Sequence, residues 1–233
     1  MEYIQGNIFD NSSILNINDI QQALKFIKLI NLKKEVCPFL VSQDASDSYS
    51  SLLGHIENIN ERLNLFDVNH LPSDKIKNSQ IILNLLKIKW QILLSGALNY
   101  ISNNKSIVSI EKSYYILSPS DFGFHNAIVN KRSIFFIDFE FSGWDDPGKL
   151  YCDFILQPKI HIPKKFHLVI KNSLLSTEYI KIYDARLHWL YELLKFKWII
   201  IQLSFLNKNK YLESNYYKLK IDEKNWIELI RKI

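Results

Sequence analysis

The sequence contains little cysteine and little glycine, and each shortage excludes a class of protein. Two cysteines in 233 residues are too few for a disulfide framework, and Cys37 and Cys152 lack the spacing of metal ligands. We therefore expect a reduced, cytoplasmic setting. The six glycines stand at positions 6, 54, 96, 123, 143 and 148, so the chain has no Gly-rich phosphate-binding loop.

Export and membrane signals are also lacking. The first ten residues, MEYIQGNIFD, contain acids and have neither the basic start nor the apolar run of a secretory signal. The longest apolar stretch near the end, WIIIQLSFL at 198–206, is too short to cross a bilayer and is preceded by two lysines. We therefore predict no membrane span and expect this stretch to belong to a buried helix.

Charge is unevenly distributed along the chain. The net charge is +5, but residues 1–70 carry five bases and nine acids, whereas residues 71–233 carry 24 bases and 15 acids. A basic surface can attract nucleic acid, a nucleotide or an anionic membrane. No recognised nucleic-acid-binding motif accompanies the charge, so we favour a solvated basic face and expect no nucleic-acid partner.

Hydrophobic periodicity predicts a mainly helical protein. Hydrophobic residues make up 47% of the chain and aromatic residues 13%, which is enough for a sizeable core. A helical period predicts a helix over 17–33, with Asn18 or Asp19 as its N-cap. Further helices are expected over 50–65, 73–101, 148–157, 164–175, 177–206 and 209–232. The helix over 73–101 is so apolar that we expect it to be central and mostly buried.

A small β segment interrupts the helices. Residues 106–118 are rich in β-branched and aromatic side chains, and two short strands are expected at 127–129 and 133–139, joined by a turn at 130–132. The fold class is therefore α+β, mainly α-helical, with a β-hairpin inserted between two helical runs.

Six acids fall within this insert and the residues that follow it: Asp121, Asp138, Glu140, Asp145, Asp146 and Asp153. Asp138 and Glu140 are two residues apart on the predicted strand, so both should point to one face. Two carboxylates on one face repel each other unless a cation neutralises them. A hard cation such as Mg²⁺ suits these oxygen ligands.

Asp121 and Asn126 have a spacing that suits phosphoryl transfer. Asp, four residues and Asn, on a loop before a strand, is the arrangement in which the Asp orients and deprotonates a hydroxyl while the Asn binds Mg²⁺. Each residue also has a structural explanation: Asp121 can cap a turn, and His125 is more often structural than phosphate-binding. Asp145, Asp146 and Pro147 can simply begin a helix.

At these residues the sequence resembles the aminoglycoside phosphotransferase and choline kinase-like family, whose members have a protein-kinase-like fold. The family pattern, His-Gly-Asp, then Asn, then Ile-Asp-Phe/Trp-Glu, then a later Asp, has its counterparts here in Pro119-Ser120-Asp121, Asn126, Ile137-Asp138-Phe139-Glu140 and Asp153. Pro119 replaces the family's His. The resemblance covers about residues 74–206.

The resemblance implies roles for these residues. Asp121 would be the catalytic base, Asn126 and Asp138 would bind Mg²⁺, and Glu140 would lie beside the metal. Ser120 and Asp153 would support the catalytic loop. ATP and Mg²⁺ are the implied cofactors, and the acceptor would be a hydroxyl of a small molecule such as a sugar, an amino alcohol or an aminoglycoside-like amine. Acidic loops of the family face such acceptors, which makes Asp145 and Asp146 candidates for binding one.

The start of the chain resembles the hinge between the two lobes of such kinases. Tyr3 and Ile4 would then be the nucleotide hinge, residues 1–9 a hinge-like segment, and residues 10–233 a helical C-terminal lobe. The early lysines at 25, 28, 33 and 34 lie in or beside a helical pattern, so the strand lysine that grips ATP phosphates is missing. We therefore expect an incomplete kinase whose N-terminal lobe lies upstream or comes from a separate chain.

Two other functions fit the same residues. A catalytically inactive, pseudokinase-like binding module, or a remnant of a kinase, would also lack the phosphate-gripping elements. A two-metal exonuclease would use Asp138 and Glu140 on an apolar strand, although such a strand usually opens its domain.

Overall fold

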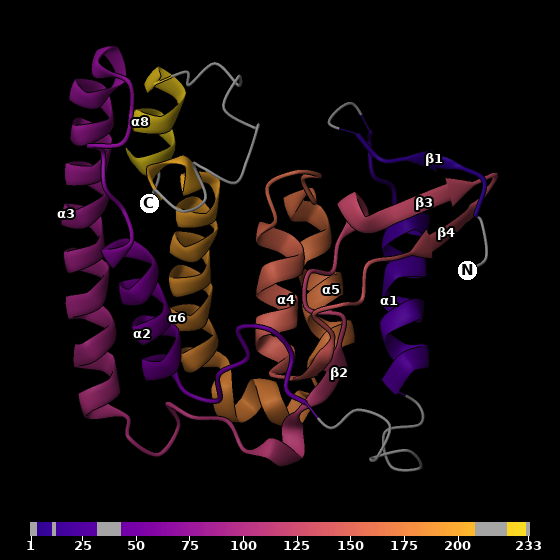
Figure 1. Cartoon of the computed structure of the whole chain (residues 1–233). Coiled ribbons are helices and arrows are strands. Elements are labelled where there is room, and N and C mark those ends of the chain that lie inside the picture. Colours follow the sequence, from indigo (N-terminus) through magenta and orange to yellow (C-terminus); the bar gives the residue numbers. More distant parts are fainter. Residues whose placement is uncertain (1–3, 11–12, 32–42, 208–222, 232–233) are drawn as a thin grey trace. The chain divides into compact units, whose positions relative to one another are not determined.

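The protein was analysed as a computed structural model, which describes residues 4–10, 13–31, 43–207 and 223–231 (Figure 1). The chain forms two compact units. One contains residues 1–51 and 107–191, and the other contains residues 52–106 and 192–233. The architecture is α+β and mainly helical with small antiparallel sheets, as the sequence predicted.

The first unit contains both sheets. In one, the order is β1-β3-β4, formed by Asn7–Ile8, Ala127–Asn130 and Ser133–Phe136. In the other, β2 (Ile116–Ser118) pairs with β5 (Gly143–Asp145). Its helices are α1 (Ile17–Asn31), α4 (Pro147–Leu156), α5 (His167–Leu174) and the first part of α6 (Thr177–Gln202). Of residues 106–118, which are rich in β-branched and aromatic side chains, only Ile116–Ser118 form a strand.

Helix α1 begins two to three residues earlier than the predicted caps would allow. The side chain of Asn16 accepts hydrogen bonds from the backbone N–H of Asn18 at 2.8 Å and of Asp19 at 3.4 Å. Asp19 in turn accepts from the N–H of Asn16 at 2.8 Å. The cap is therefore Asn16, and the expected caps Asn18 and Asp19 lie inside the first turn, where Asp19 closes a reciprocal capping box.

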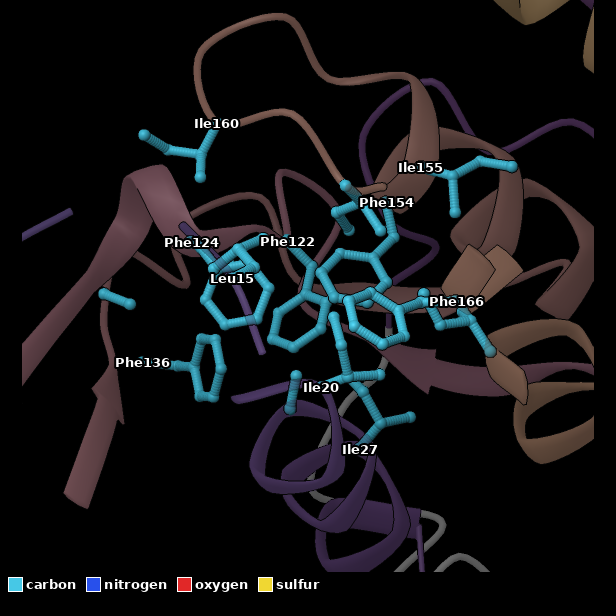
Figure 2. Packing of buried hydrophobic residues seen from close by; sticks show 14 of the residues in the cluster. Leu15, Ile20, Ile27, Phe122, Phe124, Phe136, Phe154, Ile155, Ile160 and Phe166 are labelled. Atoms are coloured by element: carbon cyan, nitrogen blue, oxygen red, sulfur yellow. The ribbon is translucent and has the colours of Figure 1, made fainter. Parts of the chain in front are cut away.

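Aromatic side chains build the core of the first unit (Figure 2). Phe122 lies 4.7 Å from Phe136 and 4.9 Å from Phe154 between ring centroids, and Phe154 lies 5.8 Å from Phe124. Ile20 and Ile27 of α1 close the core from another side, as Figure 2 shows. Phe122 and Phe124 lie within the predicted catalytic loop, between Asp121 and Asn126. Their packing in the core therefore holds that loop in place.

The hairpin forms where the sequence predicted it, but its second strand is shorter. Strands β3 and β4 pair in antiparallel register, with Ala127 opposite Phe136 and Asn130 opposite Ser133. The strand was expected to reach Phe139 but ends at Phe136, and Asp138 has a φ of 66°. This left-handed conformation is incompatible with a strand, so the expectation that Asp138 and Glu140 share one strand face is wrong.

The second unit is helical where the structure describes it. It contains α2 (Leu52–Asn64), α3 (Ser73–Asn103), the end of α6 and α8 (Glu223–Arg231). The Trp90 indole N–H of α3 donates to the Asn60 side-chain oxygen of α2 at 2.8 Å, and its ring lies 5.1 Å from that of Phe196. The predicted helix over 209–232 was only partly testable, since residues 208–222 lie outside the described residues.

Helix α3 was expected to be mostly buried, and this is wrong. Only six of its 31 residues are buried, and the others are exposed or half-buried. Within the part of the chain that the structure describes, α3 alone is long and apolar enough to cross a membrane by length and composition, which by itself is weak evidence for a span.

We predict that Phe154→Ala lowers the free energy of unfolding of the first unit by about 3–5 kcal/mol, because it leaves a cavity among the packed rings. Urea unfolding followed by circular dichroism measures the change. Phe141, which is exposed, supplies the matched control, and Phe141→Ala should cost less than about 1 kcal/mol. Equal losses in the two variants would show that the aromatic cluster does not dominate this core.

Candidate active site

The six acids singled out in the sequence separate into two sets by burial. Asp121 is half-buried, and Asp138 and Glu140 are exposed. Asp145, Asp146 and Asp153 are buried and belong to β5, the N-terminus of α4 and the body of α4. A reacting group must reach solvent-borne ligands, so only the first set can form a site that binds them.

Ser120 shapes the loop that presents Asp121. Its backbone has a φ of 66°, a conformation that costs a non-glycine residue about 1 kcal/mol or more. Its N–H donates to the Ser118 hydroxyl at 3.1 Å, and its own hydroxyl donates to the carbonyl of Ser46 at 3.2 Å. These bonds hold the tight turn at the end of β2, where the sequence placed a supporting residue. The role of Ser120 in supporting a catalytic loop stays a prediction.

Asp121 is held by two side chains from its own loop. The Nε2 of His125 lies 3.1 Å from Oδ1 of Asp121. The side-chain amide of Asn126 donates to the Asp121 carbonyl at 3.0 Å and to its Oδ2 at 3.3 Å. The hydrogen bond from His125 lowers the pKa of Asp121, and this outweighs partial burial, which acts in the opposite direction. Asp121 is therefore ionised at neutral pH with its side chain still 41% exposed.

His125 is the residue that sequence reasoning undervalued. Its side chain is only 6% exposed, and its Nδ1 is buried without a hydrogen-bond partner among the described residues. A Cβ at position 123 would lie 2.6 Å from that Nδ1, so Gly123 is needed to seat the imidazole. The i,i+4 spacing of Asp121 and His125 was the available signal, but the spacing acts here on a loop that ends in a 3-10 turn, Phe124–Asn126.

Asp138 is positioned next to this loop by the backbone and by aromatic packing. The N–H of Ile137 donates to the carbonyl of Asn126 at 3.0 Å, which ties the residue before Asp138 to the residue after His125. Phe139 stacks on Phe26 of α1 with 5.5 Å between ring centroids. Asp138 is thus fixed between two anchored neighbours while its carboxylate remains exposed.

The side-chain oxygens of Asn126 and Asp138 suit a hard divalent cation that also binds oxygens of a phosphate or of water. Asn126 uses its amide nitrogen toward Asp121, which leaves its side-chain oxygen for another partner. No hydrogen bond or ion pair engages the Asp138 carboxylate in the described part of the chain. Among the described residues no three His, Cys, Asp or Glu side chains converge on one metal position. Two protein donors fit Mg²⁺ that takes its remaining ligands from phosphate and water.

Asp145 and Asp153 form a buried chain of charges with Lys149. The Lys149 ammonium lies 2.9 Å from Oδ2 of Asp145 and 3.2 Å from Oδ2 of Asp153. Burial alone would lower the pKa of Lys149, but the two flanking carboxylates outweigh it and raise the pKa. Lys149 is therefore charged, and it pairs with two acids, one four residues before it in β5 and one four residues after it in α4.

Asp146 is the centre of a second buried network. It caps α4 by accepting from the N–H of Gly148 at 2.7 Å. The Tyr179 hydroxyl donates to the same carboxylate at 2.7 Å, and so does Nη1 of Arg186. The expectation that Asp145 and Asp146 face an acceptor is not supported, because both carboxylates are buried and engaged by cations. The alternative, that this stretch begins a helix, agrees with the structure.

The hinge-like start of the chain is only partly described. Tyr3 lies outside the described residues, and Ile4 is half-buried. The residues that follow form β1, which pairs antiparallel with β3 through Ile8 and Ile128. Within the predicted hinge-like segment 1–9, the described residues form a strand only at Asn7 and Ile8. The nucleotide-hinge role of Tyr3 and Ile4 stays a prediction.

We predict that His125→Ala raises the pKa of Asp121, because the hydrogen bond that lowers it is lost. The preference for the carboxylate operates above the ordinary aspartate pKa of about 3.9 and is lost as the pH falls through the lowered value. Carboxyl ¹³C chemical shifts measured against pH give the result directly. An unchanged pKa of Asp121 in the variant would contradict the assigned hydrogen bond between His125 and Asp121.

We predict that Arg186→Met costs about 3–5 kcal/mol of unfolding free energy, because it leaves the buried Asp146 carboxylate unpaired. Lys171→Met is the matched control: Lys171 pairs with the exposed Asp184 at 2.6 Å, and a surface pair contributes at most about 1 kcal/mol. Urea unfolding of both variants measures the difference. The buried network would lose its structural role if the two variants were equally stable.

Comparisons with known proteins give structural likenesses and no sequence relative. No family model matches the sequence, and no curated protein matches it. Among solved structures, the chain is similar to one described as amicoumacin kinase hAmiN in complex with AMP-PNP, Ca2+ and Ami, with a TM-score of 0.43 and 12% sequence identity. The match covers 99% of this chain, which spans 62% of the length of that chain. A likeness at this level identifies neither a family nor a reaction.

Proposed function

We propose that this chain carries the catalytic loop of an ATP- and Mg²⁺-dependent phosphotransferase that acts on a hydroxyl of a small molecule. The observation that carries the proposal is the Asp121 carboxylate, which is half-exposed, held by His125 and Asn126, and joined through the Ile137–Asn126 hydrogen bond to the segment bearing Asp138. A positioned, ionised acid next to two free oxygen donors is what this chemistry requires of the protein.

In this proposal Asp121 orients the acceptor and takes its proton. The acceptor O–H bond breaks, its proton passes to the Asp121 carboxylate, and the oxygen forms a bond to the γ-phosphorus of ATP. The bond from that phosphorus to the bridging oxygen breaks, and ADP leaves. The hydrogen bond from His125 favours the ionised form of Asp121, so the carboxylate is ready to accept at neutral pH.

Asn126 and Asp138 would hold the divalent ion, which when bound supplies charge neutralisation to the nucleotide phosphates. Asn126 adds a neutral oxygen and Asp138 a charged one, so the pair binds a cation without the repulsion of two carboxylates. Glu140 is exposed two residues further on and would act only at the edge of this site. The backbone hydrogen bond before Asp138 and the stacked Phe139 ring after it hold its position before any ligand arrives.

The acceptor and the remaining phosphate contacts must come from other groups. Because Asp145 and Asp146 are buried, a sugar, amino alcohol or aminoglycoside-like acceptor would be bound by other residues. Because the sequence has neither a Gly-rich loop nor a lysine placed to grip phosphate, we include in the proposal a separate chain that supplies an N-terminal lobe.

A binding function without catalysis is the second candidate. The observation in its favour is that the sequence has neither a Gly-rich loop nor a lysine placed to grip phosphate. The exonuclease alternative requires Asp138 and Glu140 to lie on one strand. Strand β4 ends at Phe136, so neither residue lies on it. Turnover with a hydroxyl acceptor separates the kinase proposal from the binding module.

We predict that Asp138→Asn abolishes Mg²⁺-dependent binding of ATP, whereas Asp121→Asn keeps it. Removing the charged metal ligand weakens the bound cation, but Asp121 contributes to the chemical step and not to the metal. Calorimetric titration with ATP and Mg²⁺ measures both. Asp121→Asn should lower the rate of ADP release, with any acceptor that supports turnover, by about 10²–10⁴-fold.

Asp184→Asn is the control, because it removes a surface carboxylate of α6 and should leave ATP binding unchanged. Binding that does not need Mg²⁺, or that survives Asp138→Asn, would contradict the metal site. A folded wild-type chain that binds no nucleotide would overturn the claim that these residues form a working half-site without a second chain.

A further inference from the structure

Helix α3 has an outer side that the described residues of its own unit leave exposed. On its inner side Ile82, Leu83, Leu86 and Trp90 are buried in the second unit. On the other side Ile81 is 43% exposed, Ile88 59% and Ile92 67%. In the most apolar 18-residue window of this helix only 28% of residues are buried. A helix serving only its own core would bury most of such a window.

The exposed isoleucines form a continuous stripe. At roughly 100° per residue, Ile81, Leu85, Ile88 and Ile92 fall within about 60° of the helix circumference. They follow one another at spacings of four, three and four residues, so each lies one turn beyond the last. We call this set the α3 stripe. It is narrow, straight and about three turns long, and Figure 1 shows α3 as one uninterrupted helix.

Lysines surround the α3 stripe, and acids are absent from it. Lys77 lies in line with its N-terminal end, and Lys87 and Lys89 flank it on either side. Between Asp74 and Glu111 the chain has five lysines and no acid. Along α3 itself, lysines and no acids accompany the apolar stripe, which suits an anionic partner that can accept apolar side chains.

The composition of this surface favours lipid over protein as the partner. Protein interfaces are enriched in aromatic residues, Met and Arg and are depleted in Lys. The α3 stripe and its flanks hold isoleucine, leucine, lysine, Asn84 and Gln91, with none of the enriched types. Lysine side chains on an amphipathic helix can lay their stems along apolar surface and place their charge at headgroup phosphates.

We propose that the outer side of α3 binds the surface of an anionic membrane. The helix would lie in the plane of the surface, with the α3 stripe entering the headgroup region and Lys77, Lys87 and Lys89 pairing with lipid phosphates. Its inner side stays in the core of its unit, so the helix does not span the bilayer. The inference is independent of the proposed phosphotransferase activity and would hold for an inactive chain.

The test is co-sedimentation of the purified chain with vesicles. We expect binding to vesicles of equal parts phosphatidylglycerol and phosphatidylcholine, little binding to pure phosphatidylcholine, and weaker binding as salt is raised. Ile92→Glu should weaken binding to the anionic vesicles by about tenfold or more, because a carboxylate enters both the stripe and the positive field. Ile88→Glu should act in the same direction.

Leu168→Glu is the matched control. Leu168 of α5 is 66% exposed against 67% for Ile92, so the two changes add the same charge at equally exposed aliphatic positions. Circular dichroism establishes that all variants fold. Equal loss in Leu168→Glu, equal binding to neutral vesicles, or no binding by the wild-type chain would overturn the proposal. The proposal would also be overturned if the chain associates with itself without lipid and Ile92→Glu abolishes that association, because the α3 stripe would then bind a protein partner.

Discussion

The ion pair between Asp146 and Arg186 is the interaction on which the first unit depends. Arg186 donates to Asp146 at 2.7 Å, to the carbonyl of Val108 at 3.2 Å and to the carbonyl of Ser50 at 3.1 Å. Asp146 also caps α4 and accepts from Tyr179. A buried ion pair is tolerated only when its remaining donors and acceptors are satisfied. Segments far apart in the sequence must therefore meet before this pair becomes stable, which makes the unit cooperative.

The buried ion pair of Asp146 is connected to the candidate site through the sheet of β2 and β5. Asp145, the neighbour of Asp146, is the last residue of β5, which pairs with β2, and β2 leads directly into the loop of Ser120 and Asp121. On its other side the loop is fixed by Phe122 and Phe124 in the aromatic core. The loop is thus anchored by charge at one end and by ring packing at the other. The Asp121 carboxylate takes part in neither anchor, and its side chain remains 41% exposed.

The sequence was sufficient for the helices but not for the acids. Local periodicity locates α1 and α2, since it depends on residues one turn apart. The strand prediction failed at Asp138, because the sequence Ile137-Asp138-Phe139 gives no sign that the aspartate adopts a left-handed backbone conformation. The spacing of Lys149, four residues from both Asp145 and Asp153, was visible in the sequence. Arg186, 40 residues beyond Asp146, was not, because no local rule pairs residues at that distance.

The two sets of acids show why a count of carboxylates is a poor guide to a site. Asp145, Asp146 and Asp153 are buried and form ion pairs with Lys149 or Arg186, so their carboxylates serve the fold. Asp121 and Asp138 carry the same chemical group but reach solvent, with one tuned by His125 and the other left without a partner in the described residues. The same separation applies to apolar side chains: those of α3 divide between an inner side that builds the core and an outer stripe that the core does not need. In both cases the groups that folding leaves unused are the ones available to bind a ligand or a surface, and only the structure distinguishes them.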